Sequence, residues 1–348
     1  MHIAKTVRIV SLVILILNCS YNIGKAGELI QAPAAIHISS TISDGKYSIP
    51  EIVEISRLNN IKIVIITDRD LMRWEYGLWP LRNIIKKTVY SNSIFNYGVG
   101  RYLNEIRRAQ ERNPDMVLIP AVESAPFYFW EGSPFDGSLK MNNWHKHMLA
   151  IGLEKVEDYQ YLPVIGNQAG LKLPFRLKDV YRLWPILILV VGVLCLQKRK
   201  FKYKDLKGHS LGPYSRPWQA CGLILIAFSF LFLLNYYPFY SYAFDQYHGD
   251  LGIKPYQNLI NYVNKHGGLV FWAHPEAEYI QNRVRVKIET KEHTGDLPEA
   301  MNYAGFAIFY EGYKKVGHPG GIWDEVLKQY CQGKRETPIW AIAGLSFD

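Results

Sequence analysis

The stretch AAIHISSTISDGKYSIPEIVEIS, residues 34–56, joins an apolar run to an amphipathic segment through a short polar loop. The run Ala34–Ile38 is typical of a buried strand. Ser48, Pro50 and Glu51 mark the start of a helix, with an N-cap and a proline in its first turn. The stretch therefore predicts a strand–loop–helix unit of an α/β domain.

The same alternation of strand and helix continues along the chain. Further strands are predicted at Ile61–Thr67, Met116–Val122, Met148–Leu153, Gly268–Ala273, Phe306–Tyr310 and Pro338–Ala343. Further helices are predicted at about Arg101–Arg112, Tyr256–His266 and Ile322–Gln332. Strands separated by helices favour a mostly parallel sheet covered by helices, or a barrel. The long aromatic-rich loops Leu71–Gly100 and Ser124–His145 are expected to be lids or packing flaps.

Composition excludes a disordered chain and argues against a nucleic-acid-binding protein. The 348 residues are 49% hydrophobic and 20% charged, which is enough to bury a full core. The net charge is +9, but the segment Gln197–Arg216 alone carries +6 of it. Because the basic character is local, we expect no nucleic-acid partner.

Two uncharged apolar runs flank this basic segment, Leu183–Leu196 and Cys221–Tyr237. With their aromatic flanks, both approach the ~20 residues that a membrane-spanning helix needs. A pair of buried core helices is the alternative. Because short basic loops stay in the cytoplasm, residues 197–216 are predicted to be cytoplasmic, within a transmembrane hairpin over residues 183–244.

The N-terminus agrees with this topology. Lys5 and Arg8 precede the apolar stretch Ile9–Leu17, so residues 1–27 are predicted to be a signal peptide or an N-terminal anchor. Residues 28–182 and 245–348 would then both be extracytoplasmic, on a protein of the cell membrane. We expect these two pieces to complete one barrel, because neither has enough strands to close alone.

Polar residues follow several predicted strands. Along the chain they are His37, Asp68 and Asp70, Glu123, His274 and Asp348. Each of these side chains alone would most simply be solvated or hydrogen-bonded. The carboxyl ends of barrel strands, however, converge on one face, and His, Asp and Glu are the ligands that divalent metals take. Their shared position favours a metal site.

The motifs IHISSTISDG, VIITDRD, VLIPAVES, HKHMLAIGL, GGLVFWAHPE and AIAGLSFD, taken in order, resemble those of the polymerase and histidinol phosphatase (PHP) family. The resemblance implies a distorted (β/α)7 TIM-like barrel, here interrupted by the transmembrane hairpin. It also implies up to three divalent ions, of zinc, manganese or iron, that activate water for phosphoester hydrolysis. The metal ligands implied by the resemblance are His37, Asp44, Glu123, His147, His274 and Asp348, with His145 as an alternative to His147. Asp68 and Asp70 would be supporting residues.

Three departures from the family pattern predict an impaired site. Ser39 stands where the family has its second histidine, and Arg69 replaces another histidine. A serine hydroxyl is a poor ligand, and a guanidinium cannot coordinate a metal at all. The family continues with a further histidine after the position of Asp348, so we expect the second barrel piece to be truncated there.

Two functions remain open from the sequence. The first is a membrane-anchored phosphoesterase of reduced activity, acting on a phosphorylated small molecule or another phosphoester. The second is a catalytically inert barrel that binds a phosphorylated or anionic ligand, with Arg69 as the cation in place of a metal.

Overall fold

The computed structural model describes residues 31–174, 176–200, 203–204, 210–211, 213–283, 285–308 and 312–343. The chain divides into two units, Met1–Pro33 and Ala34–Asp348, and everything below concerns the second. The predicted signal or anchor segment, residues 1–27, lies outside the described residues, as does Asp348.

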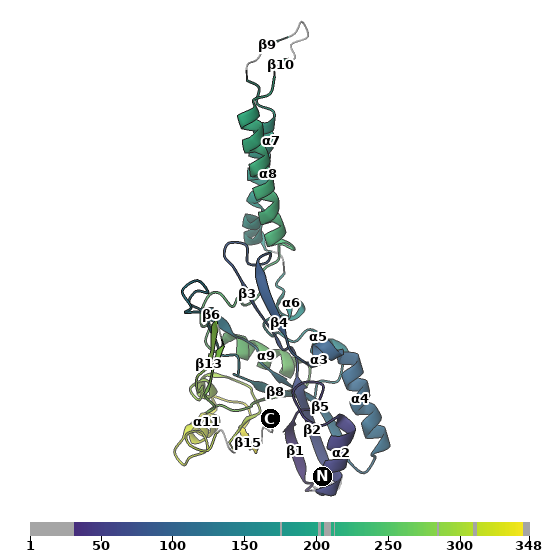
Figure 1. Cartoon of the computed structure of the whole chain (residues 1–348). Coiled ribbons are helices and arrows are strands. Elements are labelled where there is room, and N and C mark those ends of the chain that lie inside the picture. Colours follow the sequence, from purple (N-terminus) through teal and green to yellow (C-terminus); the bar gives the residue numbers. More distant parts are fainter. Residues whose placement is uncertain are drawn as a thin grey trace, which may run out of the picture. The chain divides into compact units, whose positions relative to one another are not determined.

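A seven-stranded sheet forms the centre of the domain (Figure 1). Its order is β1 (Ala34–Ile38), β2 (Ile63–Arg69), β5 (Val117–Ser124), β8 (Met148–Ile151), β11 (Leu269–Trp272), β14 (Gly305–Ala307) and β15 (Trp340–Ile342). Each strand predicted from the sequence is present. The two sequence pieces on either side of the hairpin share this sheet, because β8 of the first pairs with β11 of the second.

The sheet differs from the expected parallel barrel in two ways. Strand β8 runs antiparallel to both of its neighbours, whereas the remaining pairs are parallel. The cause is the connection from β5 to β8, which holds two short strands and no crossover helix, so the chain returns from the edge at which β5 ends. Among the described residues, no pairing joins β15 to β1, and the fold is a mixed α/β domain with an open, curled sheet.

Four longer helices accompany the sheet: α2 (Ile49–Leu58), α4 (Val99–Arg112), α9 (Lys254–Lys265) and α11 (Ile322–Cys331). Shorter ones are α3 (Ile94–Tyr97), α5 (Val156–Gln160), α6 (Gln168–Leu171) and α10 (Asp296–Glu299). The predicted N-cap Ser48 opens α2 as part of a capping box, because the backbone N–H of Ser48 donates to Glu51 at 2.8 Å. Tyr102 fastens α4 to the sheet, since its hydroxyl lies 2.9 Å from the carbonyl oxygen of Ala121.

The two long loops expected to be flaps contribute strands to two small sheets, one of which also takes strands from residues 279–290. Strands β3 (Arg73–Gly77) and β4 (Lys86–Tyr90) pair as an antiparallel hairpin. Strands β12 (Tyr279–Arg283), β13 (Val286–Thr290), β7 (Lys140–Asn142) and β6 (Phe129–Glu131) form a four-stranded sheet in that order. The Trp130 ring contacts Tyr76 at a centroid distance of 5.1 Å and so joins the two small sheets.

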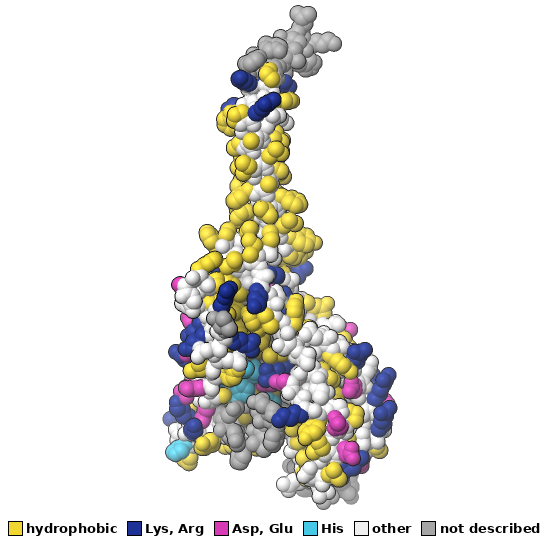
Figure 2. Space-filling view, viewed as in Figure 1, with side chains coloured by type: hydrophobic (Ala, Val, Ile, Leu, Met, Phe, Trp, Pro, Cys, Tyr) yellow, Lys and Arg dark blue, Asp and Glu magenta, His cyan; other side chains and the backbone are white. Residues whose placement is uncertain are grey.

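The predicted hairpin consists of η1 (Leu177–Leu183), α7 (Pro185–Leu196) and α8 (Arg216–Tyr236), with β9 (Tyr203–Lys204) pairing with β10 (Ser210–Leu211). Helices Asp179–Leu196 and Arg216–Tyr236 are long and apolar enough to cross a membrane, although length and composition are weak support on their own. Figure 2 shows hydrophobic side chains over the visible face of the column formed by α7 and α8.

The interior of this hairpin is lined by small and polar residues. A Cβ added at Gly222 would lie 2.7 Å from the carbonyl oxygen of Gly192, so the two backbones touch where neither residue has a side chain. The buried hydroxyl of Ser229 donates to the carbonyl oxygen of Pro185 at 2.7 Å. The chain enters and leaves the hairpin side by side, because the N–H of Leu173 donates to Ser241 at 3.0 Å and that of Ala243 to Leu171 at 2.9 Å. We call this pairing the neck ladder.

Candidate metal centre

Three side chains with metal-binding atoms meet at one edge of the large sheet. Glu123 lies near the end of β5, His147 directly before β8 and His274 shortly after β11. Their ligand atoms lie within 4.8 Å of one another, and the three residues could hold a metal ion. Because β8 runs antiparallel, its beginning lies at the edge where β5 and β11 end. His147 therefore reaches the site from the start of a strand, whereas Glu123 and His274 reach it from strand ends.

His37 approaches the same carboxylate from β1. Its Nε2 lies 3.4 Å from Oε1 of Glu123, and its side chain is buried. The backbone of His37 has φ +67°, a left-handed conformation, where the β1–β2 register shifts between Ala35 and Ile38. Strain of this kind costs of order 1–3 kcal/mol and is concentrated at functional sites. The bulge turns the histidine toward Glu123.

The protonation states of the cluster suit metal binding. Nδ1 of His147 lies 2.6 Å from Oε1 of Glu123. Burial alone would raise the pKa of Glu123, but the charges of His147 and His37 and the hydrogen bonds from His147 and His274 hold that pKa well below its usual range. Burial, partly opposed by Glu123, lowers the pKa of His147. Near neutral pH the site therefore contains a carboxylate and a neutral imidazole, which are the ligating forms.

Arg69 introduces a competing positive charge. Its guanidinium lies 2.7 Å from Oδ2 of Asp44, and its Nε lies 3.5 Å from Oε2 of Glu123. The Arg69 side chain is 17% exposed and that of Asp44 is 42% exposed. The structure thus places Asp44, an expected ligand, against Arg69, and Glu123 contacts both the histidines and this guanidinium.

Asp68 secures the loop that follows β1. Its Oδ1 accepts from the backbone N–H of Ser40 at 2.8 Å and from the hydroxyl of Ser43 at 2.6 Å. Burial raises the pKa of Asp68, and these hydrogen bonds oppose the rise. Gly45 closes the loop, because a Cβ there would overlap the carbonyl oxygen of Ser39. The Ser43–Gly45 stretch therefore also serves loop packing.

Asp70 links the end of β2 to β5. Its Oδ2 accepts from the hydroxyl of Ser124 at 2.6 Å, and its Oδ1 accepts from the backbone N–H of Leu71 at 2.5 Å. Burial raises the pKa of Asp70 to about 6, and the negative charge of Glu123 adds to that effect. Asp70 is thus a buried carboxyl next to the strand that carries Glu123.

Of the two neighbouring histidines, His147 joins the candidate metal cluster and His145 packs elsewhere. His145 lies on the ring of Tyr279, with a centroid distance of 3.7 Å, and burial lowers its pKa to about 3. Between the two histidines, Lys146 is buried, forms an ion pair with Asp296 and lies 4.1 Å from the ring centroid of Tyr256. A single buried lysine carries no sequence signal, so this anchor of the histidine segment was not predicted.

The donor set fits one divalent ion. A carboxylate and two imidazoles within 4.8 Å of one another, with His37 beside them, are typical of zinc, iron or manganese. Nδ1 of His274 is buried and has no hydrogen-bond partner among the described residues, which also suits a ligand. Arg69 opposes binding, because it already neutralises part of the Glu123 charge.

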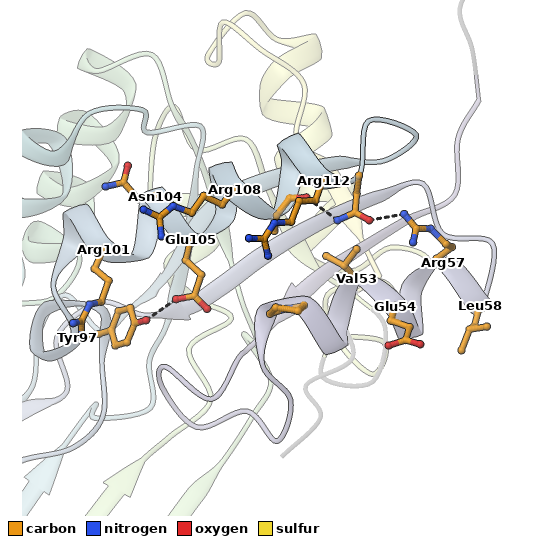
Figure 3. Close-up of a pocket in the computed structure, with 13 residues that line it drawn as sticks. Val53, Glu54, Arg57, Leu58, Tyr97, Arg101, Asn104, Glu105, Arg108 and Arg112 are labelled. Carbon is orange, nitrogen blue, oxygen red and sulfur yellow. Dashed lines mark hydrogen bonds between the residues drawn. The ribbon is translucent and has the colours of Figure 1, made fainter.

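A surface cavity of about 1020 Å³ lies between α2 and α4 (Figure 3). Its arginines Arg101, Arg108 and Arg112 are exposed, and the hydroxyl of Tyr97 donates to Glu105 across it at 2.5 Å. None of the candidate ligands lines this cleft, so cavity size does not locate the metal site.

Comparison with known proteins adds little. No family model matches the chain, and no curated protein matches it. Among solved structures, a proposed metal-dependent phosphoesterase from Bifidobacterium adolescentis is 16% identical at a TM-score of 0.38, covering 92% of this chain and 89% of that one. An amidohydrolase from Chromobacterium violaceum, with bound sulfate and no metal, is 12% identical at a TM-score of 0.35, covering 91% and 87%. At these values neither likeness defines the family or the function of this chain.

Proposed function

We propose that this chain is a membrane-anchored, PHP-type metal-dependent phosphoesterase of reduced activity. The observation that carries the proposal is the convergence of Glu123, His147 and His274, with His37 beside them, at one edge of the large sheet. These residues would hold the ion, and they come from four separate strands or strand ends. The order of the motifs along the sequence supports the PHP assignment.

The residues of the site have separable roles in this proposal. A divalent ion, when bound, lowers the pKa of a coordinated water and so supplies hydroxide near neutral pH. Glu123 contributes the negative charge of the ligand set, and His147 is kept neutral by burial. Arg69 limits that negative charge, because its guanidinium already pairs with Asp44 and contacts Glu123.

Arg69 is also the reason to expect weak metal binding. At 3.5 Å from Glu123 it shares the carboxylate that the ion requires. We expect Ser39→His with Arg69→His to raise metal content and hydrolysis by more than the ~10–100-fold typical of changes next to ligands. Elemental analysis and hydrolysis of an aryl phosphate with added manganese or zinc measure both quantities.

A matched control is Arg57→His, because Arg57 is a surface arginine paired with Asp115 at 3.1 Å. It should change neither metal content nor hydrolysis. A double variant that stays free of metal would contradict the assignment of ligands. Near-stoichiometric metal and rapid turnover in the unmodified protein would contradict the proposed impairment.

The contacts of Arg69 also favour a second function, an inert barrel that binds a phosphorylated or anionic ligand. Arg69 already pairs with Asp44 at 2.7 Å, so a cation is built into the site. Metal-independent binding of phosphate to the unmodified protein, abolished by Arg69→Gln, would favour this function over hydrolysis.

For the membrane anchor we propose that α7 and α8 span the bilayer, with residues 197–216 in the cytoplasm and the sheet domain outside. The outward-facing apolar residues and the Gly192–Gly222 contact support this, because helices in lipid pack through small residues. Reporter fusions at Lys204 should be cytoplasmic, and those at Gly166 and Gly295 exported. An exported Lys204 fusion would overturn the topology.

A further inference from the structure

A second cavity, of about 600 Å³, lies where the β3–β4 hairpin meets the end of α8 and the chain that follows it. Three arginines from different elements line it: Arg73 from β3, Arg82 from the β3–β4 turn and Arg182 from η1. Figure 2 shows Lys and Arg side chains gathered just below the apolar column. We call this cavity the neck pocket.

Direct hydrogen bonds hold the neck pocket at the end of α8. The backbone N–H of Asn83 donates to Oδ1 of Asn235 at 3.0 Å, and the amide of Asn83 donates to the carbonyl oxygen of Asn235 at 2.7 Å. The side-chain amide of Asn235 lies 3.3 Å from the carbonyl oxygen of Pro80. If α8 spans the bilayer, these bonds place the neck pocket at the surface of the bilayer.

The arginines of the neck pocket are incompletely neutralised. Arg73 pairs with Glu75 at 2.6 Å. Arg82 lies over the ring of Tyr247 at 3.9 Å, Arg182 donates to the carbonyl oxygen of Tyr240, and neither forms a salt bridge with a described residue. The Nε–H groups of all three arginines are buried without an acceptor among the described residues. Buried donors of this kind normally have a partner, and a charged guanidinium strongly favours an anion.

Three acidic residues also line the neck pocket, and each already has a partner. Glu75 pairs with Arg73, and Asp245 lies 3.1 Å from Nδ1 of His248. Asp179 accepts from the backbone N–H of Arg176 at 2.8 Å and from the hydroxyl of Ser241. The carboxylates are therefore engaged within the protein, whereas the unpartnered donors among the described residues of the pocket belong to its arginines.

The rim of the neck pocket suits a lipid–water interface. Trp79 is 79% exposed and Tyr181 is 61% exposed, and both line the pocket. Such exposed amphipathic rings are enriched at the level of lipid headgroups. An aqueous phosphate site gains nothing from an exposed tryptophan, whereas a lipid site does.

We propose that the neck pocket binds the phosphate group of an anionic phospholipid through Arg82 and Arg182. The ligand chemistry is a phosphate ester held by two guanidinium groups, with acyl chains passing beside α8. This inference rests on the proposed membrane anchor and is independent of the metal site. A bound lipid would hold the β3–β4 hairpin against the bilayer.

The test uses the full-length protein in a neutral detergent, with thermal unfolding measured during titration with phosphatidylglycerol, phosphatidylcholine or inorganic phosphate. We expect phosphatidylglycerol to raise the melting temperature more than phosphatidylcholine does. Arg82→Gln with Arg182→Gln should remove this difference or shift its midpoint at least tenfold. Arg82→Lys with Arg182→Lys keeps the charges but not the paired geometry, and should give an intermediate shift.

The control is Arg101→Gln with Arg108→Gln, which removes the same charge from the exposed cleft between α2 and α4 and should leave the lipid effect unchanged. Equal stabilisation by inorganic phosphate would identify a soluble phosphate site and overturn the lipid assignment. No effect of phosphatidylglycerol on a protein that resists alkaline extraction from membranes would overturn this inference alone. Release by alkaline extraction would instead overturn the membrane anchor.

Discussion

The sheet domain and the α7–α8 hairpin place the same kinds of residue in opposite ways. In the domain, Leu259 and Val270 are completely buried. In the hairpin, Leu223 is 61% exposed and Leu187 is 70% exposed, whereas Gly222 lies inside. Water drives leucine inward, but lipid gives it no reason to leave the surface, so hairpin packing depends on close backbone approach. The exposed leucines of the hairpin therefore support the proposed membrane anchor.

The largest expected difference concerns leucine truncation. Leu259→Ala should lower the free energy of unfolding of the domain by about 2–5 kcal/mol, because it leaves a cavity in a close-packed core. Leu223→Ala, on the outer face of α8, should change stability by less than about 0.5 kcal/mol. Denaturant unfolding of both variants in the same detergent, followed by near-ultraviolet circular dichroism, gives the comparison. Equal losses would show that α8 is packed in a protein core.

Asp70 provides a test of the polar interior of the domain. Its pKa is raised from 3.8 to about 6, so the folded state keeps a proton that the unfolded chain releases. The stability that the protonated Asp70 side chain contributes to the folded state is complete below pH 3.8, and it is lost as the pH rises through about 6. Relative to the Asp70→Asn variant, the free energy of unfolding of the wild type should fall by about 3 kcal/mol as the pH rises across this window. Unfolding of both proteins at several pH values measures it, and parallel pH profiles would contradict the assignment.

The Gly192–Gly222 contact tests the interior of the hairpin. Gly222→Leu should destabilise helix pairing by about 1–3 kcal/mol, because the added side chain meets the opposing backbone. Ile224→Leu is the control, since Ile224 is 69% exposed. Disulfide crosslinking between cysteines placed on α7 and α8 reports the pairing. Unchanged crosslinking in Gly222→Leu would mean that the helices do not meet at this point.

The smallest effect is expected at Ser229, whose hydroxyl bonds to Pro185 across the hairpin. Ser229→Ala should cost about 0.6 kcal/mol, the average for hydrogen bonds between membrane helices. The same crosslinking assay, run at graded denaturant concentrations, can resolve it. A loss of pairing stability several times larger than this would indicate that the Ser229–Pro185 hydrogen bond is shielded from both lipid and water.

The sequence was sufficient for the strands of the large sheet because their signal is local. Runs such as Ile63–Arg69 are continuously apolar until they reach their polar ends. The sequence was insufficient to predict the direction of β8. Strand direction depends on the path by which the chain returns to the sheet, and the aromatic flap before β8 has no strong helix or strand period. Two strands of the small sheets, β6 and β7, are also too short to show a period, since they have three residues each.

The residues of the candidate site could be predicted from the sequence, but the side chains that each of them contacts could not. That Glu123 and His274 lie near strand ends could be read from the sequence, and both join the cluster. The position of Asp44 against Arg69 could not be read from the sequence, because a loop carboxylate can face either a metal or a neighbouring guanidinium. Asp68 and Asp70 likewise bond to serines that carry no distinctive motif.

The neck ladder makes the hairpin a detachable module. Lys172 and Tyr242 face each other as an antiparallel bridge, so the chain leaves the sheet domain and returns at a single point. Residues 173–241 could therefore be replaced by a short glycine–serine linker without altering the connection between β8 and β11. A domain made in this way would keep Glu123, His147 and His274, and it would lose the hydrogen bonds of Asn235 with Asn83 and Pro80.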